Sequence, residues 1–304
     1  MNRGLRLNIG LAAAILLTLT GAVLLGETAL SAAQYGQALA DPASGPGEVL
    51  WQGRAPRAVC ALVVGAALGL AGAVLQGLLR NPLADPGVLG VSATAALGAA
   101  GAIVLGAAAI PGLVESAALT GAALAGLLLV AIAARVRAPE ALILFGVALS
   151  SFAGALTALI FNLSPSPIAS AEVMNWLLGS VQNRSWIDVA WVTPALAVAA
   201  VFAAWAVLAL IGATVAAGAA VAVAGGIGFV GLAAPHLVRA AVRGDPARLL
   251  LPSALAGGLM LVLADLAARL MLTDQELKLG VFTALVGAPL FALIAWRAAR
   301  EWRT

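Results

Sequence analysis

Long apolar stretches, separated by short polar segments, follow one another along the whole chain. Each has roughly 18 or more residues with few or no charges, enough for a helix to cross about 30 Å of hydrocarbon. Such stretches predict transmembrane helices, which satisfy their backbone hydrogen bonds internally. The pattern predicts spans over residues 9–26, 58–79, 88–110, 118–134, 141–162, 188–210, 249–270 and 280–297.

The composition agrees with this pattern. Of the 304 residues, 63% are hydrophobic and 10% are charged, and the mean hydropathy is +1.07. No soluble core needs so much apolar surface. We therefore expect one transmembrane domain, residues 1–304, in a lipid bilayer. The net charge is only +3 and no basic run occurs, so nucleic acid is excluded as a partner.

The uncharged segment 189–238 is too long for one span. As a helix, its fifty residues would extend roughly 75 Å. Asp188 and Arg239 are expected on opposite sides of the membrane, so the segment crosses once or three times. We favour three crossings, with breaks near Gly212 and at residues 225–228. The total is then about ten transmembrane helices in an all-α polytopic fold.

Arginines are distributed unequally between the two predicted sides of the membrane. The side richer in arginine is expected to be cytoplasmic, which places both termini in the cytoplasm. It carries Arg3, Arg6, Arg80, Arg135, Arg137, Arg239, Arg243, Arg248, Arg297, Arg300 and Arg303. The outer side carries Arg54, Arg57, Arg184, Arg269 and Lys278, with Trp51, Trp176, Trp186 and Trp191 near span ends.

Candidate enzymatic motifs lack the context that they need. Residues 226–231 match G-x-G-x-x-G, but no strand precedes them, and the chain has no P-loop for ATP. His236 is the only histidine and Cys60 the only cysteine, so no metal shell is expected. Asp265 lies four residues before Arg269, which favours an ion pair over a proton relay. We expect no catalytic residues, no metal and no cofactor.

Ordered sequence blocks resemble one family of membrane proteins over nearly the whole chain. The longest is Arg80-Asn-Pro-Leu-Ala-Asp-Pro-Gly-Val-Leu-Gly-Val-Ser92. The others are Arg54–Arg57, Gly72–Gln76, Asn175–Ser180, Gly225–Leu232, Pro235–Arg239, Ala264–Arg269 and Gly287–Pro289. They are similar to the FecCD/BtuC-like permeases of ATP-binding cassette importers for iron-siderophores, haem and cobalamin. The resemblance implies the type II ABC importer permease fold.

The resemblance also implies partners and a mechanism. The family forms a homodimer that works by alternating access, with a substrate-binding protein outside, two ATP-binding subunits inside, and a location in the bacterial inner membrane. Its docking arginines correspond to Arg54, Arg57 and Arg269, and its cytoplasmic gate to Asn81 and Leu83. A second gate position falls at Pro139 and Glu140 and is left unassigned.

Two departures from the family pattern stand out. The family has a cytoplasmic coupling loop for the ATPase, and this loop is missing here near residues 210–218. Lys278 stands where relatives commonly carry proline.

Three functions remain open after this comparison. The first is an ATP-driven importer subunit for an iron chelate, with cobalamin as the alternative substrate. A gradient-driven secondary transporter and a transport-incompetent relic are the other two.

Overall fold

The computed structural model describes residues 3–26, 28–136, 138–203, 206–242, 245–271 and 277–301. Within these ranges the chain is helical without a strand. The long helices are α1 (Arg3–Leu24), α4 (Ala55–Leu78), α6 (Leu113–Ala133), α7 (Pro139–Asn162), α10 (Ala206–Ala224), α12 (Pro246–Leu270) and α13 (Leu279–Glu301). The shorter ones are α2 (Ala32–Ala40), α3 (Gly45–Glu48), α5 (Val91–Val104), α8 (Pro167–Leu177), α9 (Trp186–Phe202) and α11 (Val230–Arg239), with a π-helical turn at Val49–Arg54 and a 3₁₀ turn at Ala107–Ala109.

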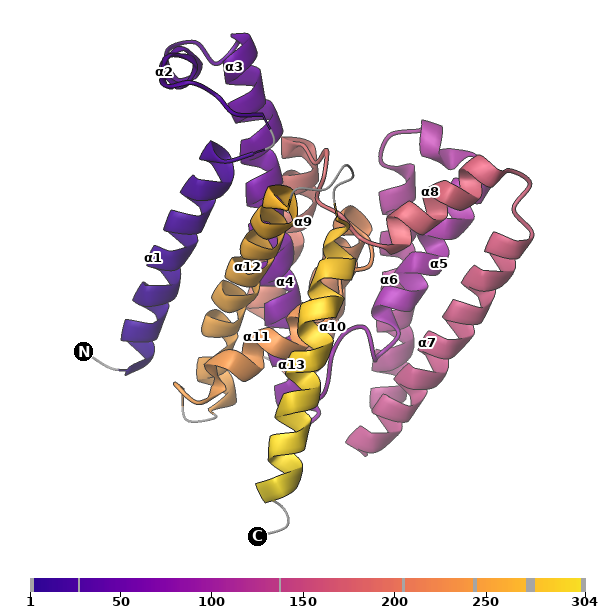
Figure 1. The fold of residues 1–304 in the computed structure, drawn as a ribbon. Coiled ribbons are helices and arrows are strands. Elements are labelled where there is room, and N and C mark those ends of the chain that lie inside the picture. Colours follow the sequence, from indigo (N-terminus) through magenta and orange to yellow (C-terminus); the bar gives the residue numbers. More distant parts are fainter. Residues whose placement is uncertain are drawn as a thin grey trace.

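The described chain runs from one end of the bundle to the other ten times (Figure 1). Nine passes are made by α1, α4, α5, α6, α7, α9, α10, α12 and α13. Residues 225–239 make the remaining pass, partly as irregular chain and partly as α11. Five of the described helices are long and apolar enough to span a membrane by themselves. Both termini lie at one end, called the inner end here, and the opposite end is the outer end (Figure 1).

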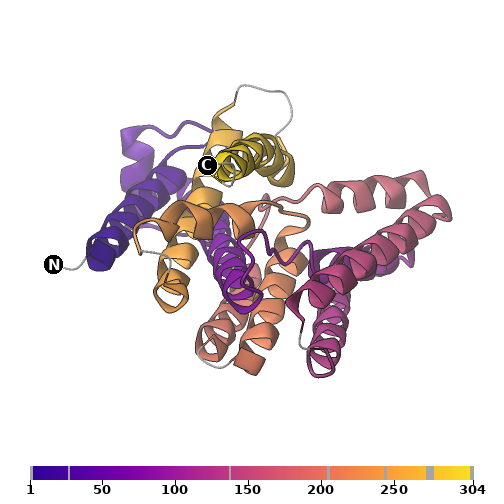
Figure 2. The same ribbon diagram turned by 90° about the horizontal axis from the view of Figure 1, so that it is seen from below.

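Helix α4 forms the centre of the bundle because small residues let its neighbours approach closely. A Cβ built on Gly65 would lie 2.3 Å from the carbonyl oxygen of Gly257 on α12. At Gly72 it would lie 1.8 Å from the carbonyl oxygen of Gly231 on α11. Contacts of this kind hold membrane helices together through backbone packing. Seen from the inner end, α1 and α7 lie at opposite edges, with α4 between them (Figure 2).

The expected break at Gly212 is wrong. Helix α9 ends at Phe202 and α10 runs from Ala206 to Ala224, so the chain reverses between these two helices. A Cβ at Gly212 would lie 3.0 Å from both Ala199 and Phe202. Glycine therefore serves the packing of α9 against α10 instead of a break. The second expected break, at residues 225–228, is confirmed, since Gly225 has a φ of 71° and α10 ends just before it.

The cytoplasmic coupling loop was expected to be missing near residues 210–218. This segment is the middle of α10, where Leu210, Ala213, Ala216 and Ala217 are buried. An insertion there would interrupt a packed helix. The neighbouring place where α9 and α10 are joined is residues 203–205.

Two features of the outer end had no counterpart among the predicted spans. Helices α2 and α3 with the π-helical turn precede α4, and α8 lies across the outer end (Figure 1). Ser31 caps α2 in a capping box with Gln34, and Ser166 caps α8 before Pro167. Both are local signals for a helix start, but the helices are too short to register as spans.

Candidate functional site

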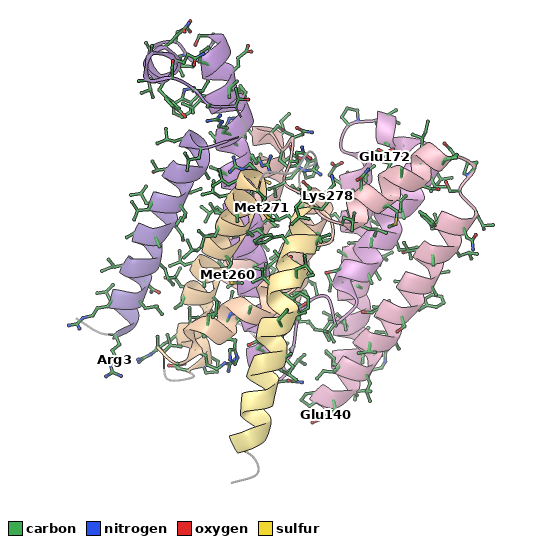
Figure 3. The ribbon with its side chains drawn as sticks, in the orientation of Figure 1. Arg3, Glu140, Glu172, Met260, Met271 and Lys278 are labelled. Atoms are coloured by element: carbon green, nitrogen blue, oxygen red, sulfur yellow. The ribbon has the colours of Figure 1, made fainter. Side chains whose placement is uncertain are left out.

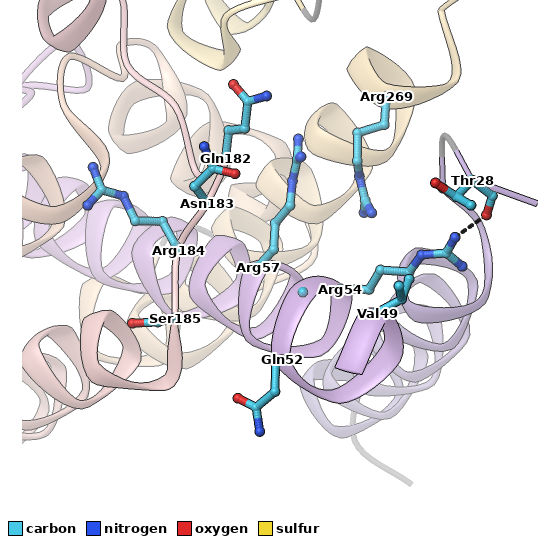
Figure 4. Close-up of a pocket in the computed structure, with 12 residues that line it drawn as sticks. Thr28, Val49, Gln52, Arg54, Arg57, Gln182, Asn183, Arg184, Ser185 and Arg269 are labelled. Carbon is cyan, nitrogen blue, oxygen red and sulfur yellow. Dashed lines mark hydrogen bonds between the residues drawn. The ribbon is translucent and has the colours of Figure 1, made fainter. Parts of the chain in front are cut away.

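Four arginines line a cavity of about 410 Å³ at the outer end, called the outer arginine pocket here. Arg54 and Arg57 come from the π-helical turn and α4, Arg184 from the connection before α9, and Arg269 from α12 (Figure 4). The other lining residues are Gly26, Thr28, Val49, Gln52, Gly53, Gln182, Asn183 and Ser185. The pocket therefore combines segments that are far apart in the sequence.

Arg54 is bound mainly by backbone carbonyl groups. Its Nη1 donates to the carbonyl oxygen of Leu24 at 2.8 Å, and its Nη2 donates to that of Thr28 (Figure 4). The side chain is 7% exposed. These bonds fix the chain between α1 and α2 against the start of α4, so Arg54 shapes the wall of the pocket as well as adding charge.

Asp265 links two of the pocket arginines. Its Oδ1 accepts from Nη2 of Arg57 at 2.8 Å and from Nε at 3.0 Å, while its Oδ2 lies 2.9 Å from Nη2 of Arg269. The side chain of Asp265 is 2% exposed. The predicted pair with Arg269 is confirmed, and Arg57 adds a link from α12 to α4. A carboxylate held on both oxygens acts as an ion-pair partner, not as an open proton carrier.

Arg184 completes the pocket from the other side. Its Nη1 lies 3.1 Å from Oδ1 of Asp188 and 3.5 Å from Oε1 of Glu115. Its side chain is 22% exposed, more than those of Arg57 and Arg269. Among the described residues, the four guanidinium groups of the pocket are accompanied by three carboxylates, which gives this part of the chain an excess of positive charge.

The structure therefore brings together the three predicted docking arginines, Arg54, Arg57 and Arg269. From the sequence, Arg184 was expected on the same side of the membrane but not in the site. Its ion pair with Asp188, four residues later, is a local signal that could have found it.

At the inner end, the predicted gate residues lie in the irregular connection between α4 and α5, residues 79–90. Asn81 holds its turn by accepting from the backbone N–H of Leu83 at 2.9 Å. Leu83 is 49% exposed. Arg80 has a φ of 49°, a left-handed conformation that favours a tight turn. The connection is thus a defined turn in which the apolar side chain of Leu83 is exposed.

The inner end of α4 is tied to α11 by a polar contact next to this turn. Gln76 is buried, and its Oε1 accepts from Nη2 of Arg239 at 2.5 Å. The unassigned second gate position, Pro139 and Glu140, forms the start of α7 at the same end of the bundle (Figure 3). Because Gln76 belongs to α4 and Arg239 to α11, a shift of α11 would act directly on the end of α4.

Ten passes through the bundle, nine of them helical and one partly irregular, define a polytopic α-helical membrane protein with a charged pocket at one end and an irregular turn at the other. Comparison with known proteins identifies the family. The model of the FecCD transport family matches residues 12–208 and 203–297, and the chain belongs to this family. It is the permease subunit of an ABC importer.

Curated relatives are similar over almost their whole length. The vitamin B12 import system permease protein BtuC of Salmonella typhi is 38% identical, with 94% of this chain and 95% of the relative covered. The protein of the same name from Salmonella typhimurium strain LT2 is 37% identical with the same coverage. A solved structure, described as an inward-facing conformation of a metal-chelate type ABC transporter, has a TM-score of 0.83 and 27% identity, covering 96% of this chain and 99% of that one.

The family match also bears on the connection between α9 and α10. Its two segments meet at residues 203–208, where α9 gives way to α10. The alignment with the Salmonella typhi protein is 313 positions long, and 94% of the 304 residues of this chain take part in it, which is about 286 residues. About 27 positions of the alignment therefore contain no residue of this chain.

Proposed function

We propose that this permease imports cobalamin by ATP-driven alternating access. The observation that carries the proposal is the 38% identity to a vitamin B12 permease over 94% of this chain. From the sequence alone, an iron chelate was the first expectation. Similarity that extends through every crossing favours the substrate of these relatives instead. Cobalamin is itself a large, rigid metal chelate, so either substrate makes similar demands on a pathway.

An apolar hollow of about 530 Å³ supports a pathway for a bulky substrate. It lies between the end of α8 and the outer half of α13, and its wall comes from Leu177, Leu178, Gly226, Gly280, Val281, Ala284, Leu285, Ala288 and Pro289. Leu285 is 65% exposed. We propose that this face turns toward a second copy of the chain, so that two such walls enclose the pathway.

The outer arginine pocket fits an acidic docking partner. We propose that Arg57 and Arg269, with Arg54 and Arg184, receive carboxylates of a substrate-binding protein, because complementary charge steers association and fixes orientation. The pocket's excess of positive charge supports this proposal.

The inner end carries the proposed gate, Asn81 and Leu83, and faces the proposed ATP-binding subunits. The chain would then lie in the bacterial inner membrane with both termini in the cytoplasm. The α9–α10 connection, residues 203–205, leaves little chain for a coupling loop. We propose that contact with the ATPase uses the other inner connections, residues 79–90 and 134–138 among them.

The substrate is tested by uptake into proteoliposomes that contain this permease with the ATPase and binding protein encoded beside it. ATP-dependent uptake of labelled cobalamin, not reduced by excess ferric hydroxamate, would support the proposal. ATP-dependent uptake of labelled ferric hydroxamate, not reduced by excess cobalamin, would establish an iron chelate as substrate. That second candidate is favoured by the similarity to a metal-chelate type transporter, with a TM-score of 0.83. Uptake driven by an ion gradient without ATP would contradict both.

A further inference from the structure

A second polar cavity lies at the inner end, between the start of α1 and the start of α12. Its volume is about 580 Å³, and it is lined by Arg3, Gly4, Asn8, Ala241, Val242, Ala247, Arg248, Leu251 and Pro252. Two guanidinium groups, from Arg3 and Arg248, thus converge on one space at the end of the bundle richer in arginine. Figure 3 shows Arg3 at the inner end of α1.

The charges in this cavity are only partly compensated. Nε of Arg248 lies 3.0 Å from Oδ2 of Asp245, and both side chains are largely exposed, at 70% and 43%. This contact leaves the terminal nitrogens of Arg248 to donate elsewhere. Arg3 has no ion pair within the described ranges of the chain. Oδ1 of Asn8 is buried and accepts no hydrogen bond from a described residue.

An apolar groove of about 660 Å³ begins where the polar cavity ends. Leu251 lines both spaces, and α1 and α12 form a wall of each. The groove continues toward the middle of the bundle along α1, where Ala12, Ile15, Leu16 and Leu19 line it, and residues of α4, α9 and α12 form its other walls.

The polar cavity and the groove together extend about as far as one leaflet of a bilayer. From Asn8, which lines the polar cavity, to Leu19, which lines the far part of the groove, the helix rises about 16 Å, close to half of a hydrocarbon core of about 30 Å. Leu16 is 68% exposed and Leu251 57% exposed, so the groove opens toward the surroundings of the bundle. A polar, basic mouth at the level of the headgroups therefore leads into an apolar channel at the depth of the acyl chains.

We propose that an anionic phospholipid occupies this site. Its phosphate would lie between Arg3 and Arg248, a headgroup hydroxyl would donate to Oδ1 of Asn8, and one acyl chain would follow the groove between α1 and α12. Basic pockets between membrane helices on the cytoplasmic side bind anionic headgroups in this manner. Phosphatidylglycerol has both the negative charge and the hydroxyl donors that the site requires. The lipid would hold α1 against the rest of the bundle.

The test is native mass spectrometry of the full chain, released from nanodiscs of phosphatidylcholine with a minority of phosphatidylglycerol. Wild-type protein should retain phosphatidylglycerol in preference to phosphatidylcholine. Each of the substitutions Arg3→Gln and Arg248→Gln should lower that retention about five-fold, and the pair about 25-fold, in line with the contribution of one basic residue near an anionic surface.

Two further variants separate this site from general attraction of lipid. Arg135→Gln removes an exposed arginine at the inner end of α6, far from the cavity, and should leave retention unchanged. Ala12→Trp fills the groove from its exposed side and should abolish retention although both arginines remain.

Several outcomes would overturn the proposal. Equal retention of the two lipids, or retention that Arg135→Gln reduces as much as the double variant, would show that no specific site exists. Displacement of phosphatidylglycerol by inorganic phosphate alone would show that the cavity binds an ion and that the groove plays no part. A polypeptide or a second copy of the chain seated over α1 and α12 in place of lipid would also contradict it.

Discussion

At the residue scale, Asp265 pairs with both Arg57 and Arg269 among the described residues. Asp265→Asn keeps the size of the side chain but removes the negative charge that these two guanidinium groups share. Breaking a buried ion pair from one side costs about 3–5 kcal/mol. We expect a clearly lower thermal unfolding midpoint in detergent, measured by tryptophan fluorescence.

Asp245→Asn provides the matched control. This carboxylate pairs with Arg248 at the surface, where an ion pair contributes about 1 kcal/mol or less, and asparagine still caps a helix well. Equal unfolding midpoints for the two variants would show that Asp265 does not stabilise the outer arginine pocket.

Cys60 offers a direct probe of the packing of α4. It is the only cysteine of the chain and is 1% exposed, in contact with the main core. A maleimide should therefore fail to label the folded protein in detergent and should label it fully after denaturation in dodecyl sulfate. Rapid labelling of folded protein would contradict the central position of α4.

At the scale of elements, the contact of α4 with α12 depends on glycine. Gly65→Ala places a methyl group where it would lie 2.3 Å from a backbone oxygen of Gly257, so the two helices must separate. Overpacking of this kind costs about 1–3 kcal/mol, which a lower unfolding midpoint would reveal.

Gly154→Ala is the matched control on α7. A Cβ there would meet no atom within 4 Å, and alanine favours a helix over glycine by up to about 1 kcal/mol. We expect no loss of stability, or a small gain. A Gly65→Ala protein as stable as this control would contradict the close helix contact.

The helices were largely predictable because apolar length is a strong signal. The expected spans 58–79, 141–162 and 249–270 end within three residues of α4, α7 and α12. The reversal between α9 and α10 was not predictable, since the residues that join them have the same apolar composition as the helices on either side. Gly212 was misplaced because glycine in a membrane helix permits packing as readily as a break.

The site was predictable in part. Charge asymmetry placed Arg54, Arg57, Arg184 and Arg269 on one side, but only the fold shows that they share one pocket and that Asp265 links two of them. No periodicity in the sequence relates Arg57 to Asp265, which are 208 positions apart. Contacts between distant helices require the tertiary structure.

At the scale of the whole molecule, the outer arginine pocket should control docking. Arg57→Gln should slow association with the binding protein encoded beside this permease and weaken its dependence on ionic strength, because steering between opposite charges is lost. Surface plasmon resonance at several salt concentrations measures this. Arg135→Gln, at the inner end, should change neither quantity. If the two variants behave alike, the pocket does not receive the partner.

The central claim is that this chain is the membrane subunit of an ATP-driven importer. The most direct measurement is co-purification with its neighbouring ATPase, followed by vanadate-sensitive ATP hydrolysis in lipid with and without the binding protein. We expect a stable complex in which the binding protein stimulates ATP hydrolysis, with contact made despite the short α9–α10 connection. If no complex forms, or if hydrolysis is indifferent to the binding protein, the chain does not couple to an ATPase and the account is contradicted.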